Sequence, residues 1–295
     1  MRRRTVGEGH LTIGLRKGEP ADAAAAGEIC YRAFKAIAEA HGFAPDFPGP
    51  EAATGTISGL IGDDRFFGVV AETDGRLVGS NFLDERNRIS AVGPITVDPE
   101  LQNDSAGRAL MQAVMRRSEE RGFAGIRLVQ AGYHCRSLAL YLKLGFEARE
   151  HLSCLQGPAI GKAAPGCAVR SATADDLAAC NALCFRVHGH DRSGELADAV
   201  AQGAARVVER AGRVSGYTTS IAFFGHAVCE TNDDLQALIG AAESFPGAGF
   251  LVPTGNGELM RWCLGEGLRI TQTLTLMSIG LYNRPNGAWL PSVLY

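Results

Sequence analysis

The chain has 295 residues, and this length favours two domains of about 140 residues each over a single one. Its net charge of −3, without a dense basic stripe and interleaved aromatic residues, disfavours nucleic acid as a partner. The basic run at residues 1–4 leads into no apolar stretch typical of a signal peptide, and no segment reaches the ~18 apolar residues of a membrane span, so we expect a cytoplasmic protein with no membrane partner. Eight cysteines without a Cys-x-x-Cys pair favour free thiols over a disulfide framework.

The first predicted elements are a strand from Leu15, a turn at Pro20 and a helix through residues 29–34. Residues 34–63 are the least regular part of the first half, because aromatic and polar residues lie there among prolines and glycines. They include His41, Phe43, Asp46 and Phe47. A turn at residues 75–79 then opens the next strand.

Residues 92–97 predict a buried strand, because they are rich in β-branched side chains and are closed by Asp98 and Pro99. Residues 102–108 form a loop of small and polar residues that leads directly into a helix. Apolar residues recur at helical spacing, at Ala106, Ala109, Leu110, Ala113 and Val114. Backbone N–H groups at the start of such a helix lack partners, and the positive end of the helix dipole lies behind them. The loop therefore predicts a phosphate-binding site.

A second strand over residues 126–131 and a helix over residues 137–146 follow. The helix contains Tyr141 and ends at Gly145 and Phe146. The unbroken order of strand, loop, helix, strand and helix predicts a single cofactor site.

These stretches resemble the two signatures of the GNAT acetyltransferases. Gln102 to Gly107 is similar to the pyrophosphate loop Gln-x-x-Gly-x-Gly, with Ser105 in place of the first glycine, and residues 137–146 resemble the helix that ends in Leu-Tyr-x-x-x-Gly-Phe. His134 stands where the family often has asparagine. The resemblance implies acetyl-CoA as co-substrate. It also implies a set of cofactor-binding residues, namely Ile95, Thr96, Val97, Gln102, Asn103, Asp104, Ser105, Ala106, Gly107, Arg108, Ala109, His134, Ser137 and Tyr141.

The same resemblance implies catalytic roles. Tyr141 stands where the family has its general acid, and a phenol with a pKa near 10 suits proton donation to a thiolate with a pKa near 8.5. The alternative is a tyrosine that only packs against the strand. Glu85 is the candidate base, with Asp84 and Ser90 near it, and the alternative is that both carboxylates are surface charges of a hairpin.

The acceptor pocket is expected in residues 34–63, which correspond to the segment that covers the acceptor in the family. His41, Phe43 and Phe47 are the candidate substrate-binding residues. The alternative is a surface loop pinned by aromatic packing.

The chain also repeats itself. At an offset of 154, Arg16 matches Arg170 and Asp22 matches Asp176; at an offset of 137, Gly75 matches Gly212. The second copy goes almost directly from strand to helix near residue 231 and has no counterpart of the loop. With a linker by composition at residues 157–166, we expect an α/β fold with a mixed sheet, made of two tandem GNAT folds. Residues 1–162 are expected to form the domain with the acetyl-CoA site, and residues 163–295 a degenerate copy.

A zinc site is the alternative use of Cys180, Cys184 and His188, which share one helix face. Cys184 corresponds to Cys30 in the first copy, where no histidine is near, so the repeat explains this thiol as a core residue and no metal is expected. The apolar ending at residues 289–295 is expected to pack on a domain surface.

The expected activity is transfer of an acetyl group from acetyl-CoA to a primary amine of a small molecule. Two alternatives stay open, a non-catalytic acyl-CoA-binding or sensor protein and an acetyltransferase for protein lysines or N-termini. Apart from the small-molecule amine no partner is implied, and the oligomeric state stays open, with a homodimer as one alternative.

Overall fold

The computed structural model describes residues 13–101 and 105–294. The first half comprises β1 (Gly14–Lys17), η1 (Pro20–Asp22), α1 (Ala23–Ala40), α2 (Pro50–Gly62), β2 (Phe66–Thr73), β3 (Arg76–Asp84), β4 (Ile89–Val92), β5 (Thr96–Val97), η2 (Pro99–Leu101), α3 (Ala106–Glu120), β6 (Gly125–Ala131), α4 (Cys135–Lys143) and β7 (Glu147–Gln156). The second half comprises β8 (Cys167–Ser171), η3 (Ala174–Asp176), α5 (Leu177–His188), α6 (Ser193–Ala201), β9 (Arg206–Arg210), β10 (Arg213–Thr218), β11 (Ala227–Cys229), α7 (Asn232–Gly240), β12 (Phe250–Pro253), α8 (Gly257–Gly265), β13 (Arg269–Gly280) and β14 (Ala288–Leu290). The second half thus repeats the first, with β11 in the place of β4 and β5 and with β14 added. The predicted α/β fold with a mixed sheet is confirmed, and the length is compatible with two domains of this kind.

Ion pairs at the start of each half repeat as the sequence correspondence predicts. In both copies an arginine of the first strand binds a carboxylate at the start of the first helix and a second carboxylate on the next strand. The distances are 2.7 and 2.6 Å in each copy, for Arg16 with Asp22 and Glu72 and for Arg170 with Asp176 and Glu209. The offsets of 154 and 137 therefore relate residues in equivalent positions.

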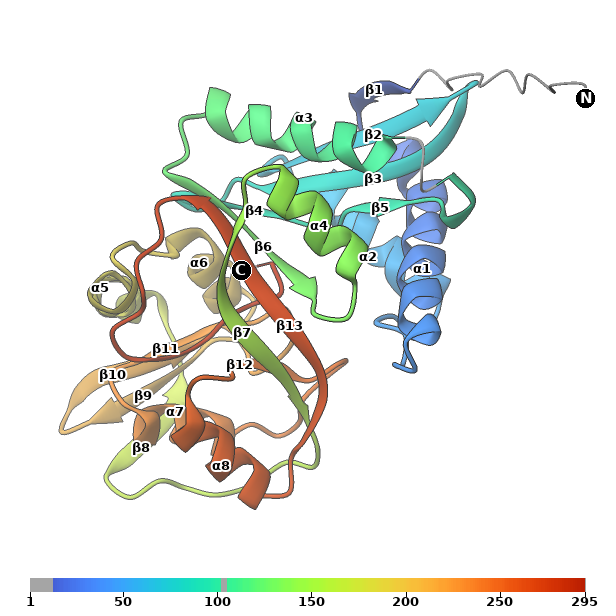
Figure 1. Cartoon of the computed structure of the whole chain (residues 1–295). Coiled ribbons are helices and arrows are strands. Elements are labelled where there is room, and N and C mark those ends of the chain that lie inside the picture. The colour runs from blue at the N-terminus through green and yellow to red at the C-terminus, as the bar shows by residue number, and fades with distance from the viewer. Residues whose placement is uncertain (1–12, 102–104, 295) are drawn as a thin grey trace, which may run out of the picture.

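The two halves exchange strands. In the described residues the larger sheet has the order β1-β2-β3-β4-β6-β13-β7-β12, with β5 on β3, and the smaller has the order β14-β11-β10-β9-β8. Strand β13 of the second half lies between β6 and β7, and β7 of the first half lies between β13 and β12 (Figure 1). Leu152 and Leu274 pair across this junction and are buried. Because the halves share one sheet, the second half forms part of the wall around the site of the first. The boundary at residues 162 and 163 stays a prediction.

Helix α3 buries the apolar face that its periodicity predicts. Leu110 and Val114 are inaccessible to solvent and pack in one cluster with Val69 and Leu83 of the sheet. This packing fixes the start of the helix relative to the strands before it. Among the helices of the described residues, none combines the length and apolarity that crossing a bilayer requires.

The predicted continuous strand over residues 92–97 is wrong. Strand β4 ends at Val92, and β5 begins at Thr96 after an interruption at Gly93 and Pro94. Proline has no N–H to donate to a ladder, so a Gly-Pro pair interrupts strand pairing. The chain then changes partner, since β4 pairs with β6 whereas Val97 pairs with Gly79 of β3.

Candidate active site

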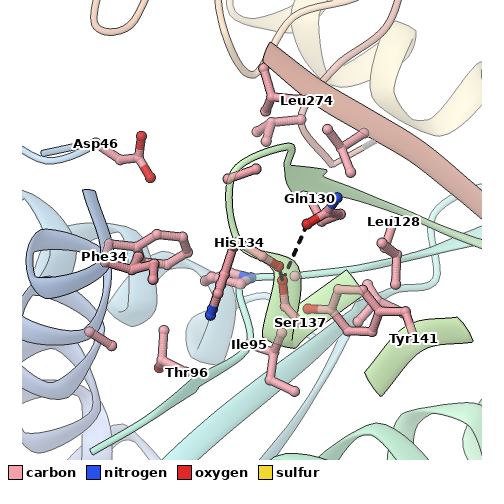
Figure 2. A pocket seen from close by; sticks show the side chains of 18 of the residues that line it. Phe34, Asp46, Ile95, Thr96, Leu128, Gln130, His134, Ser137, Tyr141 and Leu274 are labelled. Atoms are coloured by element: carbon pink, nitrogen blue, oxygen red, sulfur yellow. Dashed lines mark hydrogen bonds between the residues drawn. The ribbon is translucent and has the colours of Figure 1, made fainter. Parts of the chain in front are cut away.

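A fork between β4 and β6 opens a cavity of about 380 Å³. The parallel ladder between these strands ends at the pair of Ala91 and Arg127. Beyond that pair, residues 93–97 line one side of the cavity and residues 128–131 line the other (Figure 2). The volume lies in the range of about 300–1,000 Å³ that small-molecule sites occupy.

The start of α3 reaches the cavity and suits an anion. Ser105 precedes the helix with a φ of +67°, and its side chain makes no capping hydrogen bond. The first turn has no acidic residue, and Arg108 lines the cavity. Because the first N–H groups of a helix have no partner within the helix, these groups are available to a phosphate.

Gly107 leaves space in the cavity beside the start of α3, because it has no side chain. A Cβ at Gly107 would lie 3.7 Å from the Leu140 side chain and 3.8 Å from the Val97 side chain, and all three residues line the cavity. A larger side chain would therefore fill space in the cavity without colliding with the backbone. The chain thus fits the diphosphate of coenzyme A at this point, with Ser105, Gly107 and Arg108 as the described residues that would hold it.

Tyr141 of α4 lies in the wall of the cavity and is 6% exposed. Its ring packs edge-on against Phe146 at 6.1 Å. Burial raises the pKa of Tyr141 above its ordinary value of 10. The phenol is therefore protonated at neutral pH and can donate its proton.

Several polar atoms in the wall have no hydrogen-bond partner within the described chain. They are Thr96 Oγ1, Gln130 Nε2 and His134 Nε2, and Thr96 and Gln130 are 4% and 5% exposed. The other end of the Gln130 amide accepts a 3.2 Å hydrogen bond from Ser137 Oγ, which orients it (Figure 2). Burial and, to a smaller extent, nearby Arg136 and His41 lower the pKa of His134 to about 4, so its imidazole is neutral. Because an unpaired buried polar atom costs about 1–3 kcal/mol, these atoms favour a ligand with polar groups of its own.

The rest of the lining is largely aromatic and apolar and contains one carboxylate, Asp46, among the described lining residues. The first half contributes Phe34, Phe47 and Tyr133 to it. The second half contributes Phe223, Phe224, Gln272, Leu274, Val293 and Leu294. The cavity is thus composite, as the strand exchange implies.

Most of the sequence-predicted cofactor residues that the structure describes meet in this cavity. They are Ile95, Thr96, Val97, Ser105, Gly107, Arg108, His134, Ser137 and Tyr141. Ala106 and Ala109 do not line the cavity: Ala106 is buried, and the Ala109 N–H donates a hydrogen bond to the Ser105 carbonyl within α3. Gln102, Asn103 and Asp104 lie outside the described residues.

Of the predicted acceptor residues, Phe47 lines the cavity, whereas His41 and Phe43 stand behind its wall. Phe43 stacks on Tyr133 at 4.4 Å, and His41 lies 5.3 Å from the same ring. Both rings support Tyr133, which does line the cavity.

The predicted base Glu85 is not brought to the cavity. Its carboxylate binds Arg117 of α3 at 2.6 Å, and its side chain is 6% exposed. Asp84 is engaged by Arg86, also at 2.6 Å. Ser90 bonds Ser118 away from the lining. Glu85 is thus held in an ion pair with α3 and does not line the cavity, so this candidate is corrected.

Sequence reasoning missed Gln130 and Gln272, and it left Asp46 out of the candidate substrate-binding residues although it named Asp46 in the same segment. Asp46 was recognisable as a single acid among phenylalanines and prolines in residues 43–48, but only the fold shows that it faces a cavity. Gln272 belongs to β13, and nothing in the sequence indicates that this strand crosses into the sheet of the first half.

In the second half, β14 occupies the position beside β11 and β12 that corresponds to the fork between β4 and β6. Strand β14 pairs with β11 and packs against β12, and Ala288 and Leu290 share a core cluster with Val252. The start of α7 is capped as well, since Thr231 accepts a hydrogen bond from the Asp234 N–H. The apolar ending, expected on a domain surface, is thus partly a strand of the smaller sheet. Elsewhere in the described chain, no group of three or more potential ligands is placed for a metal ion.

Comparison with solved structures identifies the fold. The chain is similar to a candidate acetyltransferase from Pyrococcus horikoshii, with a TM-score of 0.71, 14% identity and coverage of 98% of this chain and 97% of the other. It is similar to GCN5-related N-acetyltransferases from Sphaerobacter thermophilus, with a TM-score of 0.60, 16% identity and 92% and 96% coverage, and from Kribbella flavida, with a TM-score of 0.53, 14% identity and 92% and 72% coverage. At these identities the similarity shows a common fold.

The family of the first half follows from its sequence. Residues 34–146 match the family described as Acetyltransferase (GNAT) family. The chain therefore contains a GNAT acetyltransferase domain, a fold that uses acetyl-CoA, and it is an acyltransferase. A search of curated proteins gave no match.

Proposed function

We propose that the first half binds acetyl-CoA at the fork of β4 and β6 and transfers its acetyl group to a primary amine of a small molecule. We further propose that the second half keeps the fold without a cofactor site. One observation carries the proposal: the uncapped start of α3, the fork and the Tyr141 hydroxyl all border one cavity.

Each part of the chain has a defined task in this reaction. Acetyl-CoA supplies a thioester whose carbonyl carbon is attacked by an amine. The first turn of α3 holds the diphosphate through N–H groups, and the backbone of residues 93–97 orients the pantetheine arm along the fork. Tyr141 then protonates the departing sulfur.

The composite wall favours a small acceptor over a protein. Phe223, Leu274 and Leu294 of the second half line the same cavity as Phe34 of α1 and so help to enclose it. A protein lysine or N-terminus would need an open approach for its flanking backbone. A sensor that only binds acyl-CoA does not require a proton donor, whereas Tyr141 places a buried phenol at the fork.

The experiment incubates the full chain with acetyl-CoA and a panel of small primary amines, with a lysine-containing peptide as comparison. Thiol release and the mass of the acetylated product are measured. We expect an acetylated small amine and little product from the peptide. Preferential acetylation of the peptide, or tight acetyl-CoA binding without thiol release for any acceptor, would contradict the proposal.

A further inference from the structure

We propose that Asp46 binds and deprotonates the acceptor, and that the acceptor is an apolar primary amine with a single positive charge. This inference rests on the proposed function and names the substrate class of the same site. Asp46 is a carboxylate in a lining that is otherwise rich in aromatic residues, among them Phe34 and Phe47.

Asp46 stands at the opposite end of the cavity from the proton donor. In Figure 2, Asp46 and Phe34 lie on one side and Tyr141 and Leu128 on the other. An amine placed between them has a carboxylate behind it and the thioester in front of it. This arrangement separates the base from the acid, as transfer from an ammonium to a thiolate requires.

The surroundings of Asp46 suit a base. Burial raises the pKa of Asp46 above its usual range, and a hydrogen bond from the Gln272 amide partly offsets this effect. A raised pKa brings the carboxyl closer to neutral pH, where a general base is most effective. Gln272 comes from β13, so the second half positions the base of the first half.

The walls define the rest of the acceptor. Phe34, Phe47 and Leu274 are apolar lining residues at this end, and Gln130 offers a buried amide N–H without a partner in the described chain. Asp46 is the single carboxylate among the described lining residues, so a second ammonium group would be buried without a counter-charge. A hydrocarbon body, aromatic or branched, buries against these walls instead.

Two protons leave the nitrogen in this step, one to each side chain. The ammonium gives one proton to the Asp46 carboxylate, and the freed lone pair forms the C–N bond to the acetyl carbon. The C–S bond breaks, and its electron pair stays on sulfur. The sulfur takes the Tyr141 proton, and the second proton of the nitrogen restores the tyrosine. Asp46 releases its proton to water, so the products are an amide, a thiol and one proton.

The first test compares amines in matched pairs. 2-Phenylethylamine is compared with phenylalanine, which adds a carboxylate, and hexylamine with 1,6-diaminohexane, which adds a second ammonium. We expect kcat/KM to be at least about tenfold higher for the singly charged amine of each pair, because an added ammonium finds no second carboxylate in the described lining and an added carboxylate is repelled by Asp46. Equal or higher values for the diamine or the amino acid would overturn the acceptor class while leaving the proposed function intact.

The second test uses variants of the full chain. Asp46→Asn should lower kcat/KM for the preferred amine by about 10²-fold or more at neutral pH, with acetyl-CoA affinity unchanged, and Asp46→Glu should restore part of the loss. Gln272→Ala should shift the acidic limb of the kcat/KM–pH profile to higher pH, a change that a merely structural residue would not cause. Full activity of Asp46→Asn would overturn the role of Asp46. No acetylation of any amine by the wild type would overturn the proposed function and the inference with it.

Discussion

The phenol of Tyr141 can be removed with little disturbance to the fold, so its chemistry can be tested alone. Its ring packs against Phe146 within an apolar cluster, and Tyr141→Phe keeps that packing, while the hydroxyl has no hydrogen-bond partner among the described residues. Because no hydrogen bond is lost, the free energy of unfolding should change by less than about 1 kcal/mol. If the phenol protonates the leaving thiolate, turnover should fall by about 10²-fold, the lower end of the range for general acids, because a thiol is a fair leaving group even without help. This fall corresponds to about 2.7 kcal/mol of activation free energy.

The assay is thiol release under saturating acetyl-CoA, combined with calorimetric measurement of acetyl-CoA affinity. Tyr217→Phe is the matched control, since Tyr217 is also a buried tyrosine but its hydroxyl lies 3.2 Å from His226 in the second half. The control should lose stability, by about 1 kcal/mol, and keep its turnover. Turnover of Tyr141→Phe within threefold of the wild type, or a loss confined to acetyl-CoA binding, would refute the reasoning.

Two further predictions concern stability. Ser105 adopts a left-handed φ of +67°. Ser105→Gly should therefore raise the melting temperature by about 2–4 °C, whereas Ser105→Ala, which keeps a Cβ, should not. Equal melting temperatures of Ser105→Gly and the wild type would contradict this. Burial, together with nearby Arg192, lowers the pKa of His226 to about 4, against an ordinary value of 6.5. The unfolded chain therefore binds a proton before the folded one does, and stability is lost as pH falls from about 6.5 towards 4. We expect a loss of about 2 kcal/mol between pH 7 and 5 in denaturant titrations, smaller in His226→Gln; a flat profile in the wild type would refute it.

Local patterns predicted the parts of the fold that depend on local contacts. The periodicity of residues 106–114 predicted α3, and the two arginine–aspartate pairs at an offset of 154 predicted the repeat, because each pair closes over six residues. The Gly93-Pro94 pair could also have predicted the interruption of the strand. We predicted a continuous strand instead, because the residues around the pair are rich in β-branched side chains.

The rest depends on contacts between distant segments. Strands β7 and β13 have similar apolar patterns, and either could pair within its own half, so the exchange follows from packing that no local pattern encodes. Glu85 was taken as a base because the residue that neutralises it, Arg117, lies 32 positions further along the chain. The role proposed for Asp46 depends on residues of the second half that line the same cavity, Gln272 among them.

The central claim is that the single acetyl-CoA site lies at the fork of the first half. Calorimetric titration of the full chain with acetyl-CoA tests it, with Gly107→Val as the variant and Gly59→Val, in an open position of α2 outside the cavity lining, as the control. We predict one site per chain, because β14 fills the second opening and Thr231 caps α7. We also predict that the site is lost in Gly107→Val and kept in Gly59→Val. Two sites per chain, or binding that survives in Gly107→Val, would contradict the account.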